Sequence, residues 1–496
     1  MKITFIHMGA ESLGIEYLSS CLKQRGHEVD LVFDPALFND QRLFSSPGLY
    51  KIFNNSSNLI KNVLKSKPDL VAFSVFTNNY QWACDLAQKL KKEINVPIIF
   101  GGIHPTSCPE EVIGQKFVDM ICIGDGEEAM LELIESLEKG KIDYNIKNLW
   151  FKKDGEIIKN DVRALAENLD GIPFPDKELF AKNILFKDQY VIMTARKCPF
   201  NCFYCSNNYL RKIYIGKGKY VSRRSPDNVI EELKFAKEKY HPKEIMFFDD
   251  VFTSDMAWLR EFFERYEKEI AIPYRCISHP AYLTKDIVLL LKKTNCLSIQ
   301  LGVQTVNEDT RRKIINRYET NDKLKETFAL CDQYHLEYNI DHIFGLPFES
   351  EKDYIKAAEI YINNKYCTKI NNCWLSYFPG TEIVNIARQN GMLDEKDIED
   401  IKKGKIRTYI SGGSITDKKL IRVCKNFSLF FEMIPILPNK ISRIILKHSL
   451  YRFFYIFNPV LGLPVMLISM IKSRDRRVIN YMKYYLINFK RNIYEK

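Results

Sequence analysis

The sequence lacks the two features that mark a secreted protein. Its 13 cysteines are odd in number and mostly stand singly in apolar runs, which excludes the paired framework of a disulfide-stapled domain. The first residues, Met1–Ile6, have the pattern of a strand rather than of a secretory signal. The absence of both features predicts a cytoplasmic protein with reduced cysteines. The chain of 496 residues is long enough for several domains of ~150 residues each.

Net positive charge is nearly absent outside the C-terminal tail. The formal net charge is +11, yet residues 440–496 alone hold 12 Lys or Arg against Asp475 and Glu495, a net charge of +10. The rest of the chain is therefore close to neutral. This distribution disfavours a nucleic-acid partner and favours a partner that is specific to the tail.

The tail also lacks an uninterrupted apolar span. Phe453–Ile471 is a run of 19 uncharged residues, but Asn458-Pro459, Gly462 and Pro464 interrupt it, and a spanning helix needs ~20 apolar residues. We therefore favour peripheral contact with an anionic membrane over a true span, and an ordinary helical subdomain with a basic face is the alternative. The flanking basic residues are Lys447, Arg452, Lys472, Arg474, Arg476 and Arg477.

Three cysteines do cluster, at Cys198, Cys202 and Cys205. Intervals this short place three thiolates on one loop, which can hold three corners of a cubic iron–sulfur cluster and leave the fourth iron open. A structural zinc site would need a fourth Cys or His at ligand spacing, and the next such residue is His241. The alternative is a set of buried core thiols.

This pattern resembles the radical S-adenosylmethionine superfamily, and the aromatic Tyr204 before the third cysteine also fits it. The resemblance implies a [4Fe-4S] cluster on Cys198, Cys202 and Cys205. It also implies that the methionyl amino and carboxylate groups of S-adenosylmethionine bind the fourth iron.

Residues 186–395 contain six β/α units. Six units are too few for a closed eight-stranded barrel, so we predict an open partial (β/α)6 barrel, which is also the fold of the family, with its active face at the carboxyl ends of the strands. The predicted strands are Tyr190–Thr194, Glu244–Phe248, Tyr274–Ser278, Leu297–Val303, Tyr338–Phe344 and Asn371–Tyr377.

The ends of these strands carry the residues that the family uses for its cofactor. Asp249 and Asp250 follow the second strand, where the resemblance implies contact with the methionyl amino group; a turn that caps the next helix is the alternative. Gln304 ends the fourth strand, and its amide suits ribose hydroxyls. Ile343 and Gly345 end the fifth strand, like the family element that packs on adenine. Arg311 and Arg312 follow Gln304, and we expect them either to meet a carboxylate or to lie on a solvated helix face.

Residues 1–140 alternate strand and helix, which predicts a doubly wound, Rossmann-like parallel sheet with its ligand site at the strand ends. The layout resembles the cobalamin-binding domain that precedes many radical S-adenosylmethionine domains. Ser74, Gly101 and Gly102 match its later motifs loosely. Glu11 stands where the family has its cobalt-binding histidine, so we expect no histidine ligand from this position; a relic domain without cofactor is the alternative.

Two further regions complete the α/β organisation. Residues 141–185 read as a linker with a hairpin at Asp154-Gly155, and Pro173 and Pro175 stiffen it. Residues 396–496 form a helical, basic region without a motif. The predicted order is therefore cobalamin-binding domain, linker, partial barrel and helical tail.

The resemblance implies that an electron donor such as flavodoxin or ferredoxin reduces the cluster, and that S-adenosylmethionine then yields a 5′-deoxyadenosyl radical. With cobalamin between the two domains, the leading prediction is C-methylation of an unactivated carbon of a hydrophobic or lipid-like substrate. A radical cyclase or oxidative enzyme of the same architecture is one alternative. A non-catalytic cobalamin or iron–sulfur sensor is another.

Overall fold

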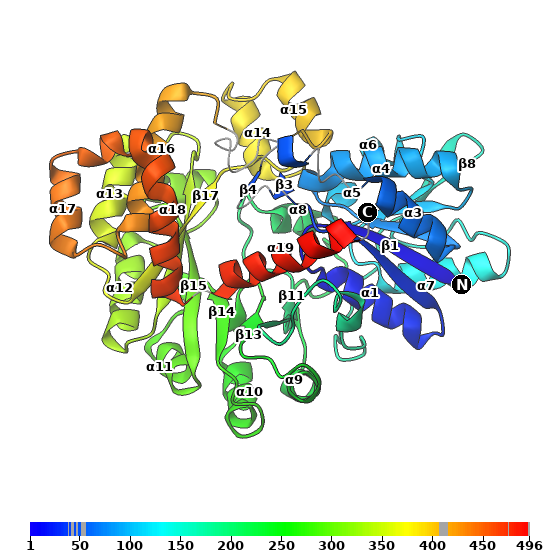
Figure 1. Ribbon diagram of the computed structural model, residues 1–496, viewed down its shortest axis with the longest axis horizontal. Helices are drawn as coiled ribbons and strands as arrows, with labels where there is room; N and C mark the ends of the chain where they lie inside the picture. The colour runs from blue at the N-terminus through cyan, green and yellow to red at the C-terminus, as the bar shows by residue number, and fades with distance from the viewer. Residues whose placement is uncertain are drawn as a thin grey trace.

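Two α/β domains lie side by side in the computed structural model, and the C-terminal helices cover parts of both (Figure 1). The structure describes residues 1–37, 39–40, 44–45, 48–50, 56–405, 415–474 and 476–494.

The first domain is built on a seven-stranded sheet, as Figure 1 shows at the right. Five strands are parallel and the last two are antiparallel. The doubly wound parallel sheet that the sequence predicts is therefore confirmed. In spatial order the strands are β2 (Glu28–Asp34), β1 (Lys2–Met8), β5 (Leu70–Ser74), β6 (Ile98–Gly101), β7 (Met120–Cys122), β8 (Leu149–Lys153) and β9 (Glu156–Lys159).

Helices cover both faces of this sheet because its strands are apolar on both sides. In β1, Phe5 packs toward α1 (Leu13–Gln24) and α7 (Glu127–Glu138), whereas Ile6 packs toward α3 (Ser56–Ser66) and α4 (Tyr80–Glu93). Successive side chains of a strand point to opposite faces, so this alternation produces two separate cores. Both cores leave the carboxyl ends of the strands available for a site.

The hairpin that the sequence analysis assigns to the linker belongs to the first sheet. β8 pairs with β7, and β9 pairs with β8 across the turn at Asp154-Gly155. The turn itself is where the sequence predicts it. The sheet of the first domain therefore continues beyond residue 140, because the edge of β7 offers free backbone groups that β8 satisfies.

The second domain holds six parallel strands whose spatial order equals their order in the chain. This open arrangement confirms the predicted partial barrel. Five of the predicted strands overlap the observed ones closely, while the sixth begins four residues earlier because Cys367 already pairs with Tyr338. The strands are β10 (Tyr190–Ile192), β13 (Ile245–Phe247), β14 (Tyr274–Ser278), β15 (Cys296–Gln304), β16 (Tyr338–Phe344) and β17 (Cys367–Trp374).

Capping residues set the starts of the outer helices. Ser225 accepts a hydrogen bond from the backbone N–H of Asn228 at the start of α9 (Pro226–Tyr240), and Thr284 accepts one from Ile287 at the start of α11 (Lys285–Lys293). Such caps satisfy N–H groups that have no partner within the helix. The other helices on the barrel are α10 (Met256–Glu269), α12 (Asn321–Gln333) and α13 (Glu351–Tyr361).

The C-terminal region is helical, as the sequence predicts. Helix α16 packs its phenylalanines into the core of the second domain, and α19 crosses from the second domain to the first (Figure 1). In α19, Tyr484 donates a hydrogen bond to the carbonyl of Gly9 at 2.6 Å, and Lys483 pairs with Asp188 at 2.5 Å. The helices are α14 (Glu382–Gln389), α15 (Glu395–Lys402), α16 (Lys418–Met433), α17 (Asn439–Lys447), the short η7 (Leu450–Phe453), α18 (Phe454–Ser473) and α19 (Arg476–Tyr494).

None of the helices within the described ranges is both long and apolar enough to cross a membrane alone. Two segments, Leu450–Ile456 and Val460–Ser473, satisfy length and composition together but meet at an angle of 101°. Some residues behind the tail prediction fall outside what the structure describes: Asp475 and Glu495 entirely, and the side chains of Asn458, Pro459, Arg476 and Arg477.

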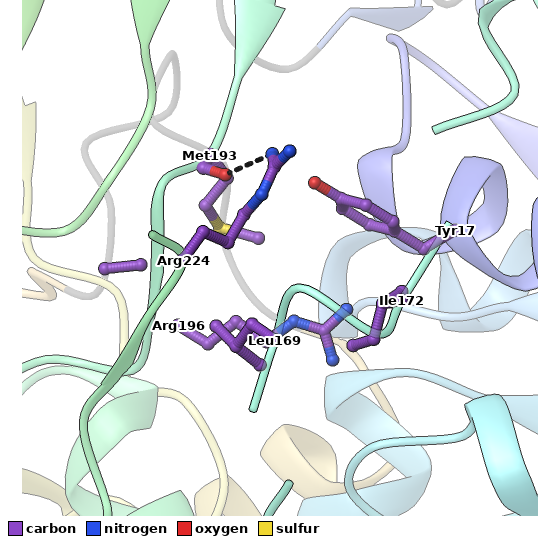
Figure 2. Close-up of a pocket in the computed structure, with 7 residues that line it drawn as sticks. Tyr17, Leu169, Ile172, Met193, Arg196 and Arg224 are labelled. Carbon is purple, nitrogen blue, oxygen red and sulfur yellow. Dashed lines mark hydrogen bonds between the residues drawn. The ribbon is translucent and has the colours of Figure 1, made fainter. Parts of the chain in front are cut away.

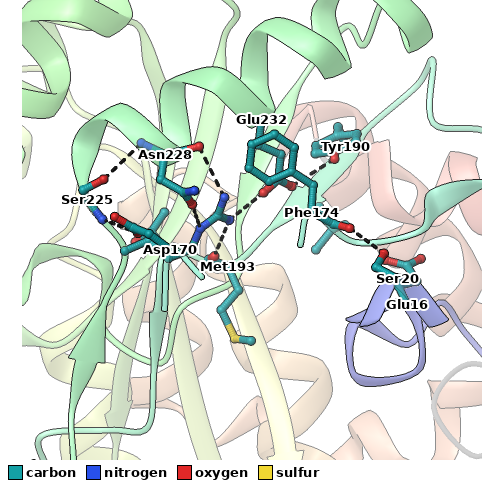
Figure 3. Close-up of polar contacts among 12 residues, drawn as sticks. Glu16, Ser20, Asp170, Phe174, Tyr190, Met193, Ser225, Asn228 and Glu232 are labelled. Atoms are coloured by element: carbon teal, nitrogen blue, oxygen red, sulfur yellow. Dashed lines mark hydrogen bonds and ion pairs between the residues drawn. The ribbon is translucent and has the colours of Figure 1, made fainter. Parts of the chain in front are cut away.

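The linker binds both domains through hydrogen bonds (Figure 3). On the first domain, Ser20 donates to the carbonyl of Phe174 at 2.5 Å, and on the second domain the N–H of Ser225 donates to Asp170 at 2.9 Å. These contacts attach residues 170–174 of the linker to both domains.

A buried lysine joins the linker to the first domain. Lys177, in the short helix η2 (Lys177–Leu179), is 1% exposed and pairs with Glu11 and, at 2.9 Å, with Glu16. Its ammonium also donates to the carbonyl of Val191 at 2.9 Å. Burial raises the pKa of Glu16 well above 4.5, and the ammonium opposes that rise. A buried charge is tolerated only with such partners.

Replacing Lys177 with methionine should lower the free energy of unfolding by about 3–5 kcal/mol, because the buried Glu16 and the partly buried Glu11 lose their cation. Without the ammonium, the pKa of Glu16 in the folded state rises further above its unfolded value. The variant should therefore be least destabilised in acidic buffer, and its deficit should grow as pH rises through the folded-state pKa of Glu16.

Urea unfolding across a pH series measures this deficit, with the exposed Lys187→Met as the control. A deficit that is independent of pH, or equal in the two variants, would contradict the prediction.

Candidate functional site

The three clustered cysteines lie on one loop at the carboxyl end of the first barrel strand. The loop runs from β11 (Ala195–Arg196) to α8 (Ser206–Ile213), and Cys205 is the N-terminal cap of that helix. The N–H of Cys205 donates to the carbonyl of Cys202 at 3.1 Å. Cys202 is buried, and the other two thiols are half-buried.

The donor set fits an iron–sulfur cube. Burial raises the pKa of Cys198 to about 12 and that of Cys202 to about 11, and neighbouring thiols add to both shifts. The three sulfurs therefore lie within electrostatic reach of one another. Throughout the described part of the chain, no three His, Cys, Asp or Glu side chains are arranged around a single metal ion.

Asp249 fixes the base of the cysteine loop. One of its carboxylate oxygens accepts from the N–H groups of Thr194 and Ala195 at 2.6 and 2.8 Å, and the other accepts from the Thr194 hydroxyl at 2.6 Å. Asp249 is 1% exposed. Both oxygens are thus engaged by the loop itself, so its role in the structure is to position the loop rather than to face a ligand.

Asp250 is the carboxylate that remains open beside the cysteines. It is exposed, and it accepts a hydrogen bond from the side chain of Asn207 at 3.1 Å. Its charge raises the pKa of both Cys198 and Cys205, which places it beside two of the three thiols. Of the predicted acidic pair, only Asp250 is free to meet an ammonium group.

Two ion pairs tie the cysteine loop to the first domain. Arg196 pairs with Glu127 at 2.6 Å, and Lys197 pairs with Asp125 at 2.6 Å. Both acidic residues follow β7, at the carboxyl end of the first sheet. All four side chains are at most one-third exposed. The carboxyl ends of the two sheets therefore face each other at this junction.

A glycine makes close approach possible at the same junction. Gly124 has a φ of +75°, and a Cβ atom there would overlap the hydroxyl of Tyr214, which accepts a hydrogen bond from the N–H of Asp125 at 2.8 Å. A small pocket also opens between the domains at this level (Figure 2). It is lined by Tyr17, Leu169, Ile172, Met193, Ala195, Arg196 and Arg224.

Of the predicted adenine-binding residues, Ile343 lies in an apolar cluster at the end of its strand. Ile343 is buried there together with Leu346 and Tyr377, and Tyr204 packs against the cluster. Gly345 has a φ of +79°, and a Cβ atom there would overlap the side chain of Ile415. The structure therefore brings Tyr204 to the same apolar cluster as Ile343, although these two residues are far apart in the sequence.

Gln304 ends β15 with a strained backbone. Its φ is +67°, and it is 9% exposed. Non-glycine residues rarely adopt this conformation, and it concentrates at functional sites. The neighbouring carbonyl of Gly302 accepts a hydrogen bond from Arg317 at 2.5 Å.

Arg311 has a role that the sequence analysis did not foresee. It is fully buried, donates two hydrogen bonds to the carbonyl of Thr305, at 3.2 and 2.5 Å, and reaches the side chain of Asn321 at 2.8 Å. It therefore does not lie on a solvated face. It stiffens the loop after Gln304 instead, whereas Arg312 is exposed.

Sequence reasoning missed two polar residues beside the cysteines. Arg317 pairs with Glu319 at 2.7 Å. Burial lowers the pKa of Arg317, whereas the charge of the nearby Cys202 raises it. His279 follows β14 and stacks on Phe200 of the cysteine loop at a ring distance of 3.7 Å. Applying the strand-end rule to β14 would have identified His279. Nothing in the local sequence marks Arg317.

The first domain presents its predicted loops at neighbouring strand ends. Ser74 and Gly101 are in register on β5 and β6. Gly102 has a φ of +104°, and a Cβ atom there would lie 2.7 Å from the carbonyl oxygen of Val75, so this glycine is required by close packing of two loops. Glu11 pairs with Lys177 rather than pointing outward.

Two histidines near these loops are structural. His7 lies 3.0 Å from the carbonyl of Ala10, and burial lowers its pKa to about 4. His104 lies 3.2 Å from the hydroxyl of Thr77, and burial likewise lowers its pKa to about 4. Both rings are buried, so neither is presented as an open metal ligand.

Comparison with known proteins places both domains. Residues 192–360 match the sequence profile of the Radical SAM superfamily, and residues 7–134 match that of the B12 binding domain. An uncharacterized methyltransferase of Pyrococcus horikoshii is 26% identical over 77% of this chain and 79% of its own length. The anaerobic magnesium-protoporphyrin IX monomethyl ester cyclase of Rubrivivax gelatinosus is 23% identical over 87% of this chain and 77% of its own length.

Solved structures share the fold. The cobalamin-dependent S-adenosylmethionine radical enzyme OxsB, with aqua-cobalamin and S-adenosylmethionine bound, aligns with a TM-score of 0.66 at 14% identity over 100% of this chain and 80% of its own. The methyltransferase TsrM from Kitasatospora setae, with cobalamin and a [4Fe-4S] cluster bound, aligns with a TM-score of 0.62 at 14% identity over 78% of this chain and 75% of its own. Both of these solved structures contain cobalamin.

Replacing Cys202 with alanine should abolish cluster loading, because two thiolates cannot hold three corners of the cube. Iron content and visible absorption after anaerobic reconstitution measure the loss. Cys84→Ala, which removes a half-buried thiol in the first domain, is the control and should leave the iron content unchanged. Equal iron content in the two variants would show that the loop does not hold the cluster.

Proposed function

We propose that this chain, which belongs to the cobalamin-dependent radical S-adenosylmethionine enzymes, attaches a methyl group to an unactivated carbon of a hydrophobic or lipid-like substrate. The observation that carries the proposal is the pair of ion pairs, Arg196–Glu127 and Lys197–Asp125, that holds the cysteine loop against the strand ends of the first domain. When bound, the cluster with S-adenosylmethionine supplies a 5′-deoxyadenosyl radical, and cobalamin carries the methyl group. Holding reacting groups in one place is worth several kcal/mol.

Residues of the barrel hold the first two cofactors in this proposal. Cys198, Cys202 and Cys205 bind the cluster, and Asp249 positions their loop. Asp250 accepts hydrogen bonds from the methionyl ammonium of S-adenosylmethionine, a charge-assisted contact.

The nucleoside is held at the neighbouring strand ends. Gln304 bonds the ribose hydroxyls, because its amide both donates and accepts. Tyr204, Ile343 and Gly345 line the side of the barrel that receives adenine.

The first domain holds cobalamin through its strand-end loops. Ser74, Gly101 and Gly102 lie at the carboxyl ends of neighbouring parallel strands, where doubly wound sheets bind their ligands. Because Glu11 is bound to Lys177, it supplies no ligand to cobalt. Residues 1–140 thus form the core of the cobalamin domain, 141–185 connect it, 186–395 hold the cluster and S-adenosylmethionine, and 396–496 add the helical region.

Exposed aromatic side chains on the loops after the strands favour the hypothesis that the substrate is apolar. Phe76, Phe248 and Phe348 are 46%, 54% and 58% exposed, and each lies on a loop that follows a strand of one of the two sheets. Tyr318 is 67% exposed and bonds to Asn316, which in turn bonds to the cysteine loop at Asn201. Exposed apolar groups beside a site mark surfaces that bind apolar ligands.

A radical cyclase is the second candidate. It is favoured by the similarity to the magnesium-protoporphyrin ester cyclase, which extends over 87% of this chain. Both candidates require a one-electron donor, for which a flavodoxin or ferredoxin is suited.

An anaerobic assay with methyl-labelled S-adenosylmethionine, cobalamin and a reductant should form 5′-deoxyadenosine and transfer label to a component of an apolar extract of cells. The Cys202→Ala variant should do neither, because it holds no cluster. 5′-Deoxyadenosine without labelled product would favour the cyclase. Absence of 5′-deoxyadenosine in fully reconstituted, reduced protein would favour a non-catalytic sensor and refute the enzyme.

Replacing Asp250 with asparagine should weaken the binding of S-adenosylmethionine by roughly tenfold to a hundredfold. A hydrogen bond to a charged group contributes about 1.5–3 kcal/mol, and the variant loses that contribution. The iron content of the Asp250→Asn variant should stay normal, because the Asp250 side chain bonds to the side chain of Asn207 and not to the backbone of the cysteine loop. Asp249→Asn is the matched variant and should lower iron content, because its amide group cannot accept all three loop hydrogen bonds. Equilibrium binding and iron analysis distinguish the two; unchanged affinity in Asp250→Asn would remove this residue from the site.

A further inference from the structure

Helix α18 exposes an apolar stripe and buries a partly polar one. Val460, Leu467, Ile468 and Ile471 are 71%, 43%, 47% and 79% exposed, and they recur at helical spacing on one face. The opposite face buries Val465, Ser469 and Ser473. An ordinary surface helix has the reverse arrangement, with its apolar stripe toward the core. The described residues therefore cover this stripe only in part.

The apolar surface continues beyond α18. Helix α18 contacts the short η7, and η7 in turn contacts α17, which lies at the end of the molecule farthest from the first domain (Figure 1). Further apolar side chains that are at least two-fifths exposed are Ile441, Ile444, Leu450, Phe453, Tyr455 and Ile456. We call this surface, formed by α17, η7 and α18, the outer face. Contiguous apolar surface of this kind marks an interaction site.

The segment that forms the outer face carries charged side chains of one sign only. Between Glu432 and Asp475 the sequence contains no acidic residue, but it contains six basic ones. Lys440 and Lys447 are exposed on α17 beside Ile441 and Ile444. The remaining basic residues of the segment are Arg443, Arg452, Lys472 and Arg474.

Two of these arginines are held in place by the second domain. Arg443 donates to Asn363 at 2.6 Å, and Arg452 pairs with Glu351 at 3.0 Å. These contacts anchor α17 and η7 on the barrel, so the outer face is presented as a fixed surface rather than as a loose tail.

We propose that the outer face docks on the surface of a lipid bilayer that contains anionic lipid. Apolar side chains interleaved with lysines match the acyl and headgroup layers of such a membrane. A second copy of this chain is disfavoured as the occupant, because a two-fold contact would place the same basic residues opposite each other. The proposal does not depend on the chemistry of the active site.

Vesicle flotation of the full, cluster-loaded chain tests this proposal. The protein should float with vesicles of phosphatidylcholine and phosphatidylglycerol, should bind pure phosphatidylcholine much more weakly, and should dissociate as salt is added. The double change Lys440→Glu and Lys447→Glu should weaken binding to the vesicles by about thirtyfold or more. Each basic residue near an anionic membrane contributes about 1 kcal/mol of binding free energy, and about 1.4 kcal/mol corresponds to a tenfold change in affinity.

The double change Ile468→Asp and Ile471→Asp should abolish flotation, because it places charges in the apolar stripe. Both residues are exposed, so the variant should keep the circular dichroism and iron content of the parent. The control is Leu289→Asp on α11, an apolar residue that is 39% exposed elsewhere on the barrel, and it should float normally.

Three results would overturn the proposal. They are equal binding to neutral and anionic vesicles, flotation that the Ile468→Asp and Ile471→Asp change does not reduce, and absence of flotation at low salt. Sedimentation velocity without vesicles identifies the competing occupant: a dimer that the same double change converts to monomer would assign the outer face to a second copy of this chain.

Discussion

The site depends on the contact between the cysteine loop and the strand-end loop of the first domain. Arg196 and Lys197 precede the first cysteine directly, and their partners, Glu127 and Asp125, follow the last parallel strand of the first sheet. Half-buried ion pairs are stronger than exposed ones because water and salt screen them less. This contact fixes the distance between the two strand-end surfaces, and each surface alone would offer only half of a site.

Buried carboxylates and their partners hold each half in shape. Asp249 accepts three hydrogen bonds at the base of the cysteine loop, and Glu11 binds Lys177 where the linker meets the first domain. Removing one partner from such a group leaves an unpaired buried charge, which costs more than the pair contributes. The protein therefore uses charge for positioning close to the proposed cofactors, which leaves Asp250 as the exposed carboxylate beside the cysteines.

Local patterns predicted the strands and the three cysteines, because apolar runs and ligand spacing are properties of adjacent residues. Partnerships between distant residues were not predictable. Asp249 and Thr194 are 55 positions apart, and Glu11 and Lys177 are 166 apart, so no local pattern relates them. The same limit explains Arg311, whose burial depends on how the loop after β15 folds back onto its own carbonyl groups.

We propose that the ion pairs between the cysteine loop and the first domain bring the cluster and cobalamin face to face. Electron paramagnetic resonance of the reduced cluster in protein that also holds cob(II)alamin tests it most directly, since two nearby unpaired spins broaden and split each other's signals. We expect the resonance signals of the cluster and of cob(II)alamin to be coupled when both cofactors are present. Each signal should be sharp when the other cofactor is omitted. Two superimposed, unperturbed signals would contradict it, because they would place the cofactors too far apart to share one substrate.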